Sequence, residues 1–134
     1  MKNSDFKFLG YRVSQFSMNI DDSVTFSDDI LSQEINIETN FSDEDRRFVE
    51  LVLNIAITSE TGKIQLHLQL KGAFKANDKM SDKVFDTLAR QNAPAILFPY
   101  ARAIISNYTV QANLPPIILP VINFVNDTGK ENLP

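Results

Sequence analysis

Apolar and polar residues alternate along the start of the chain, and the alternation changes phase once. The apolar positions are odd up to residue 13 and even from residue 16: Leu9, Tyr11, Val13, Phe16, Met18 and Ile20. A period of two is typical of a strand with one buried face. A slip of one residue, here near Ser14 and Gln15, is what a β-bulge or a sharp bend produces. We therefore predict a strand that is bulged near its middle.

Three further segments alternate in the same way. Residues 34–41, 48–58 and 63–70 carry apolar side chains at every second position. Ser42–Asp45 is a short charged turn, and Gly62 supplies the positive φ of a hairpin turn between the last two segments. Tight turns of this kind require antiparallel pairing. The pattern predicts four antiparallel strands, with a long acidic connection between the first and the second.

The apolar period lengthens after Asn77, which indicates helix. Ser81 is a candidate N-cap. The stretch Asn92–Pro94 predicts an interruption, after which Pro94 can open a second helical segment. Pro99 predicts a kink in that segment, because proline lacks a backbone donor.

The segment 114–124 is both apolar and rich in proline. Three prolines exclude a helix or a central strand, yet the segment holds seven large apolar residues. It must pack on something, either inside the subunit or across an interface. The whole pattern predicts an α+β fold, with a four-stranded antiparallel sheet followed by a kinked long helix, in a chain that forms homo-oligomers.

Composition and charge exclude several classes of function. The 134 residues carry 17 acidic and 13 basic side chains, and a net charge of −4 argues against a nucleic-acid partner. Residues 21–45 hold nine carboxylates and no Lys or Arg, which we interpret as a solvated surface or, alternatively, a docking site for a partner. With no cysteine and a single histidine, His67, we expect no enzyme, no metal site and no cofactor. No apolar run is long enough to span a membrane, so we expect a cytoplasmic protein.

Two motifs in the second half of the chain are specific. Residues 97–102 read Leu-Phe-Pro-Tyr-Ala-Arg, and residues 119–124 read Leu-Pro-Val-Ile-Asn-Phe. Together with Gly72-Ala73-Phe74, they resemble the signature of the SecB family of protein-export chaperones. We expect the matching residues to build the fold: Leu97, Phe98, Pro99, Tyr100, Ala101, Arg102, Leu119, Pro120, Asn123 and Phe124.

The resemblance implies a fold, an assembly and an activity. It implies one SecB-like domain over residues 1–124, with residues 125–134 as a flexible tail, assembled as a homotetramer that is a dimer of dimers. It also implies an ATP-independent holdase that binds unfolded or partly folded polypeptides along hydrophobic grooves, for protein export. The groove residues would come from the connection after the first strand and from the proline-rich segment: Val24, Phe26, Ile30, Pro115, Ile117, Ile118 and Val121.

The sequence leaves open whether the chain binds the export motor and whether it serves many clients or one. The family presents acidic residues on the outward face of its first and fourth strands to dock the export motor ATPase. The corresponding positions here, Gln15, Asn19, His67 and Gln69, are neutral, and residues 125–134 lack the amphipathic helix and zinc ligands with which the family continues. Binding of the motor ATPase is therefore an open question. The alternatives are a SecB-like chaperone dedicated to one partner, such as an antitoxin, and a non-catalytic oligomeric scaffold that kept the fold.

Overall fold

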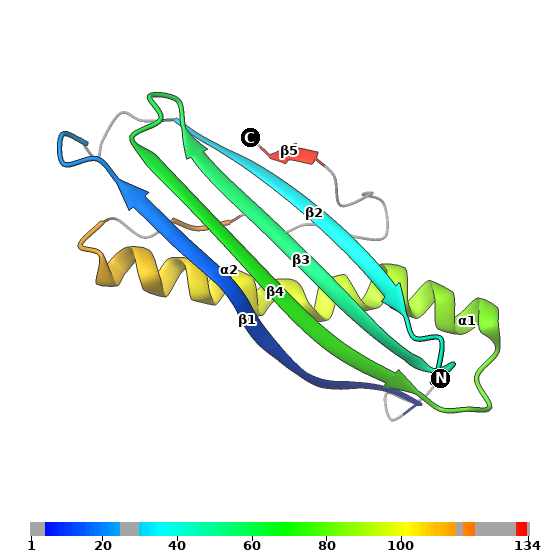
Figure 1. Ribbon diagram of the computed structural model, residues 1–134. Helices are drawn as coiled ribbons and strands as arrows, with labels where there is room; N and C mark the ends of the chain where they lie inside the picture. The colour runs from blue at the N-terminus through cyan, green and yellow to red at the C-terminus, as the bar shows by residue number, and fades with distance from the viewer. Residues whose placement is uncertain (1–4, 25–29, 115–116, 120–130, 134) are drawn as a thin grey trace.

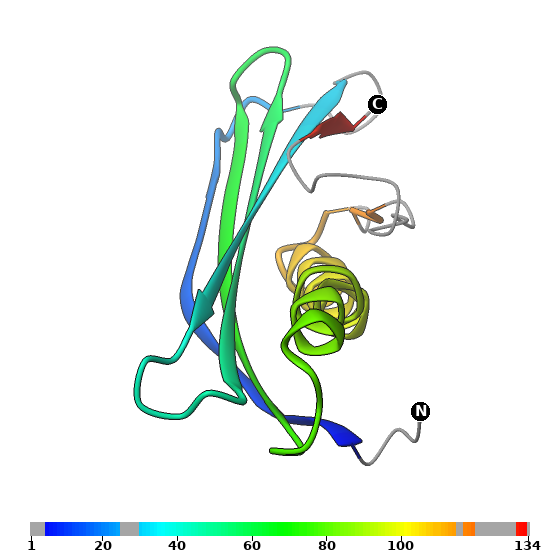
Figure 2. The same cartoon turned by 90° about the vertical axis from the view of Figure 1, so that its right-hand side faces the viewer.

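The chain forms one antiparallel sheet with helices on a single face (Figures 1 and 2). The computed structural model describes residues 5–24, 30–114, 117–119 and 131–133. The strands lie in the order β1-β4-β3-β2-β5. The elements are β1 (Phe6–Ile20), β2 (Leu31–Phe41), β3 (Phe48–Ser59), β4 (Ile64–Ala76), α1 (Asp82–Thr87), a π-helical turn η2 (Leu88–Asn92), α2 (Ala93–Gln111) and β5 (Glu131–Leu133). The predicted α+β fold, with four long antiparallel strands followed by a long helix, is confirmed.

One face of the sheet packs on the helices and is almost wholly apolar. Alternate residues of β3 and β4, such as Leu51 and Leu68, are fully buried on this face. Gly72 marks a close approach of α2 to β4, because a Cβ added at residue 72 would lie 3.0 Å from Cδ1 of Leu97. The alternation read from the sequence therefore separates the core from the outward face.

Strand β1 has two irregularities that keep its apolar side chains on one face. Val13 pairs with Leu70 and Gln15 pairs with Gln69, so Ser14 is the extra residue of a bulge, as predicted. Its hydroxyl donates a hydrogen bond to Oε1 of Gln69 at 2.7 Å. A second shift in register leaves Leu9 as the extra residue, 55% exposed and apart from the other apolar side chains, just before Gly10, whose φ of +135° favours glycine. Each extra residue shifts the alternation of side chains by one position, so the apolar residues before it and after it both face the helices.

The helical region confirms its predicted start and corrects the predicted interruption. Ser81 is the N-cap of α1, and its hydroxyl accepts a hydrogen bond from the Val84 amide at 3.2 Å. No break occurs at Asn92–Pro94, because the helix continues through η2, where the Ala93 amide donates to the Leu88 carbonyl. This wider turn leads into α2 and accommodates Pro94, which lies at the start of α2.

The sheet also contains a short strand that the sequence pattern did not predict. Residues 131–133 form β5, which pairs antiparallel with β2. These three residues belong to the segment 125–134 that the sequence suggested would be a flexible tail. The division into a domain over residues 1–124 and a tail stays a prediction.

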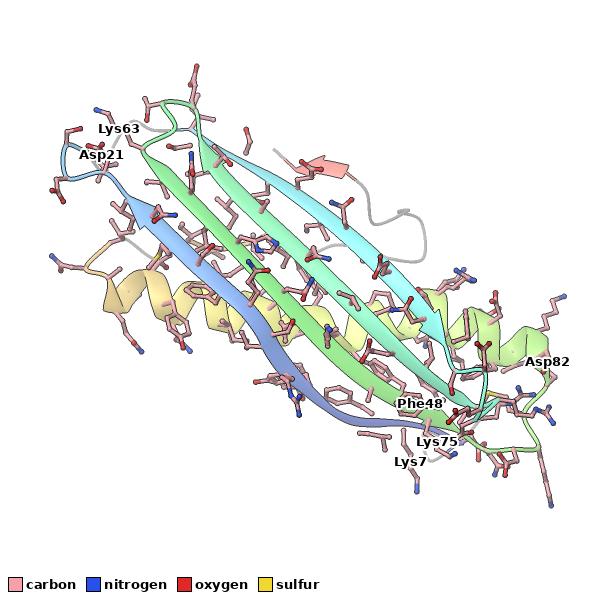
Figure 3. The ribbon with its side chains drawn as sticks, viewed as in Figure 1. Lys7, Asp21, Phe48, Lys63, Lys75 and Asp82 are labelled. Atoms are coloured by element: carbon pink, nitrogen blue, oxygen red, sulfur yellow. The ribbon has the colours of Figure 1, made fainter. Side chains whose placement is uncertain are left out.

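The turn between β2 and β3 is fixed by Asp45. Figure 3 places Lys75 at the same end of the sheet as Phe48, and the Lys75 ammonium donates a hydrogen bond to the Asp45 carboxylate. The Arg47 amide donates to the same carboxylate at 3.3 Å. The hydrogen bond from Lys75, and then that from Arg47, lowers the pKa of Asp45 below its ordinary value of 3.8. The turn is therefore held most firmly while Asp45 is ionised.

Acid is expected to weaken this contribution to stability. Because the pKa of Asp45 is lower in the folded chain, its contribution is present above the ordinary value of 3.8 and is lost as the pH falls through the folded-state pKa. The free-energy difference between wild type and Asp45→Asn, measured by urea unfolding, should shrink between about pH 7 and about pH 3. Asp43→Asn, in the same turn, is the matched control. An unchanged Asp45→Asn difference across this range would contradict the prediction.

Candidate functional site

Two predicted groove residues, Val24 and Ile30, flank the connection between β1 and β2. Val24 ends a turn in which its amide donates to the Asp21 carbonyl at 3.0 Å, and its side chain is half-buried. The hydroxyl and amide of Ser23 donate to the Asp21 carboxylate and lower the pKa of Asp21. The Ile30 carbonyl accepts from the Glu60 amide at 2.8 Å, yet the side chain is 66% exposed. Phe26, predicted with them, lies outside the described residues.

The proline-rich segment packs on α2 of the same subunit where it is described. The Ile117 amide donates to Oγ1 of Thr109 at 3.0 Å, and the Ile117 carbonyl accepts from the Ser106 hydroxyl at 2.9 Å. Ile117 is thereby buried, whereas the next residue, Ile118, is 68% exposed. The structure thus separates two predicted groove residues: Ile117 belongs to the core and Ile118 offers its side chain to solvent. Pro115 and Val121 lie outside the described residues.

The described signature residues divide between the core and the surface of α2. Leu97, Phe98 and Ala101 are buried under the sheet. Nε of Arg102 donates to the Leu119 carbonyl at 3.0 Å, which ties the first motif to the second. Pro99 and Tyr100 are exposed on α2. Pro120, Asn123 and Phe124 lie outside the described residues.

A surface that sequence reasoning missed runs along the open edge of β1 and the adjoining side of α2. The rings of Tyr11 and Tyr100 lie 4.8 Å apart, and those of Phe16 and Tyr108 lie 4.5 Å apart. Tyr11, Val13, Tyr100 and Tyr108 are each at least 40% exposed, and we call these four residues the β1–α2 strip. The only signal in the sequence was the number of apolar side chains on what proved to be an edge strand. Exposed apolar surface of this kind marks interaction sites.

The outward face of β1 and β4 is neutral at the four positions named from the sequence. Gln15 and Gln69 are cross-strand neighbours, and the Gln69 amide donates to Oδ1 of Asn54 at 3.0 Å. Asn19 and His67 lie on the same face by register. Among the described residues, no group of three His, Cys, Asp or Glu side chains could hold a metal ion. No helix in the described part of the chain is long and apolar enough to cross a membrane.

Strand β2 carries a buried polar side chain near its start. Gln33 is only 6% exposed, and its Oε1 has no hydrogen-bond partner among the residues that the structure describes. It pairs in register with Ile57 on one side and Leu133 of β5 on the other. A buried acceptor left unpaired costs free energy.

Replacing this amide is expected to stabilise the chain. Gln33→Met keeps the length of the side chain and removes the unpaired oxygen, so the free energy of unfolding should rise by about 1 kcal/mol. Gln65→Met, at an exposed position of β4, is the matched control and should change stability by less than about 0.5 kcal/mol. Urea unfolding at one protein concentration measures both. A loss of stability in Gln33→Met alone would mean that the amide is already satisfied.

Comparisons with known proteins place the chain in a family. The family described as preprotein translocase subunit SecB matches residues 13–126. The chain belongs to the SecB family. It is 34% identical over 126 residues to an uncharacterized protein of Methanocaldococcus jannaschii, across 87% of this chain and 78% of that protein. It is 39% identical over 97 residues to the protein-export protein SecB of Rickettsia akari, across 70% of this chain and 61% of that protein.

A solved structure extends the likeness to the SecB fold. A SecB-like chaperone of Mycobacterium tuberculosis, in complex with a ChAD peptide from an antitoxin, matches with a TM-score of 0.72 over 89% of this chain and 88% of the other, at 10% identity. The resemblance to SecB seen in residues 97–102 is therefore confirmed by the family match and by the fold. The chain spans less than two thirds of the length of the Rickettsia protein.

Proposed function

We propose that this chain is an ATP-independent SecB-family chaperone that binds unfolded or partly folded polypeptides and serves protein export. The observation that carries the proposal is the exposed apolar surface at Ile30 and Ile118 on a SecB-family fold. A holdase needs such surface for non-native chains and enough charge to stay dispersed, and the net charge of −4 meets the second need. The protein-export name of the Rickettsia relative supports the export role.

The β1–α2 strip has a different use in this proposal, because it supports self-assembly. It lies on an edge strand, where unpaired backbone groups accompany exposed apolar side chains, and such edges pair with a second copy. A homotetramer that buries the strip would leave Ile30 and Ile118 free for clients. The molecular mass in solution, measured by sedimentation equilibrium, tests the assembly.

The second candidate function is that of a SecB-like chaperone dedicated to one partner. The neutral positions Gln15, Asn19, His67 and Gln69 on the outward face favour it, since the route by which the family docks the export motor relies on acidic residues there. The structural match to a chaperone solved with an antitoxin peptide also favours a dedicated partner. Titration against the export motor ATPase separates the two scopes, because tight binding would remove the dedicated-only candidate.

The function is tested by suppression of aggregation. The protein, at one tetramer per client, should keep a chemically denatured client from aggregating after dilution, as followed by light scattering. The double variant Ile30→Asp with Ile118→Asp should lose most of this effect, because charge on exposed apolar positions prevents contact with apolar client segments. Thr58→Asp, exposed on the outward face of β3, is the matched control and should act as wild type. Wild type with no effect at this ratio would contradict the proposed function.

A further inference from the structure

Strand β2 is an edge strand that is only partly covered. Residues 33–35 pair in register with β5, as Gln33 with Leu133, Glu34 with Asn132 and Ile35 with Glu131. Beyond them, residues 36–41 pair with β3 on one side and with no strand on the other within the described part of the chain. Figure 1 shows β5 as a short arrow beside the long arrow of β2. The backbone N–H and C=O groups of such an edge can accept an added strand.

The side chains along this open edge suit an extended polypeptide with alternating character. Ile37 and Thr39 are half-buried on the helix face, and Phe41 is partly exposed there. The Phe41 ring lies 5.6 Å from the Phe85 ring and 5.1 Å from the Arg90 guanidinium, so helix residues form one wall beside the strand. An added strand would place every second side chain against this wall, which offers an aromatic ring and a guanidinium, and the others in solvent. Selectivity of this kind requires only an apolar residue at alternate positions.

The strand that now lies on this edge is a poor occupant. Three residues give few ladder hydrogen bonds, and Oε1 of Gln33, in register with Leu133, stays buried and unpaired beside it. A longer strand would add hydrogen bonds along residues 36–41. β5 can therefore occupy the edge of β2 and still be replaced by a longer strand, because the longer strand would form more hydrogen bonds.

We propose that β2 is a strand-addition site for extended stretches of non-native polypeptide, and that β5 is an internal competitor that occupies it. This inference rests on the proposed function, because the competing ligand is the client itself. It adds two features to that function: the client would form backbone hydrogen bonds with β2, and β5 would regulate this binding. Client binding would displace β5. The apparent affinity for the client would equal the intrinsic affinity multiplied by the fraction of molecules in which β5 is not docked.

The chain contains no cysteine, so β5 can be locked by one engineered disulfide. Glu34 and Asn132 are direct cross-strand neighbours, and Glu34 is exposed. The double variant Glu34→Cys with Asn132→Cys should form a disulfide on oxidation, as adjacent antiparallel strands bring the two Cβ atoms within bonding reach. Its reduced form is the control for the substitutions, and Glu34→Cys alone is the control for the redox treatment. Failure of the disulfide to form would overturn the proposal.

The probe is reduced and carboxymethylated α-lactalbumin, which stays unfolded and cannot exchange thiols. Its dissociation constant should be about tenfold weaker for the oxidised double variant than for the reduced one, and about threefold tighter after deletion of residues 131–134. Equal binding by the oxidised, reduced and deleted proteins would overturn the competition while leaving the proposed function intact. Weaker binding after deletion would also overturn it. Binding by none of the forms would overturn the proposed function, and this inference with it.

Discussion

Valine at position 72 is expected to destabilise the chain by about 2–3 kcal/mol. Gly72 lies on the helix face of β4, and a Cβ there would meet Cδ1 and Cδ2 of Leu97 at 3.0 and 3.2 Å and the Phe74 ring at 3.3 Å. Leu97 and Phe74 are fully buried and cannot move into solvent. Alanine needs only a small shift of these neighbours, whereas the two methyl groups of valine force α2 away from the sheet. Urea unfolding measures the loss.

Ala73, the next residue of β4, provides the control for Gly72→Val. Ala73 faces outward and pairs with Gly10, which has no side chain to clash, so Ala73→Val should change stability by less than about 0.5 kcal/mol. In a double-mutant cycle, Gly72→Val combined with Leu97→Ala should cost less than the sum of the single losses, because the smaller side chain makes room for valine. Equal stability of Gly72→Val and Ala73→Val would refute the close approach of α2 to β4.

Loss of Arg47 is expected to cost about 3 kcal/mol. The side chain is only 2% exposed and connects the β2–β3 turn to the start of α1. Its guanidinium donates to the carbonyls of Met80 and Arg46 and to the Asp82 carboxylate. It also lies 5.2 Å from the centre of the Phe85 ring. Arg47→Met keeps the apolar stem but leaves the carbonyls of Met80 and Arg46 without these donors. The hydrogen bond to Met80 is buried, and an acceptor left unpaired there costs free energy.

Arg46 provides a matched control, because it lies next in sequence and contacts the same carboxylate. Its guanidinium lies 3.6 Å from Asp82, but the side chain is 67% exposed. Arg46→Met should therefore cost less than about 0.5 kcal/mol, as is usual for an exposed ion pair. Urea unfolding of both variants at one protein concentration gives the comparison. Equal losses in the two variants would show that burial of Arg47 contributes nothing.

The strands could be predicted because each buries one face. The period-2 pattern gave the inward residues of β2, β3 and β4, and the phase slip in β1 gave the bulge at Ser14. These features depend on local geometry, since side chains alternate along any strand. The Ser81 N-cap was predictable for the same reason.

Other features depend on contacts between distant residues and could not be predicted in this way. The segment after Leu114 had to pack somewhere, but only the structure shows Ile117 hydrogen-bonded to Thr109 and Leu119 to Arg102 in the same subunit. The interruption expected at Pro94 was wrong because a π-helical turn accommodates the proline. Strand β5 carries no period that three residues could reveal.

The proposed function requires that this chain bind non-native polypeptide through exposed apolar surface. Fluorescence anisotropy measures this binding when one labelled protein is titrated in its permanently unfolded form and in its native form. We expect saturable binding of the unfolded form, no binding of the native form, and a loss of affinity in the Ile30→Asp and Ile118→Asp double variant. Equal binding of both forms, or binding of neither, would contradict the proposed function.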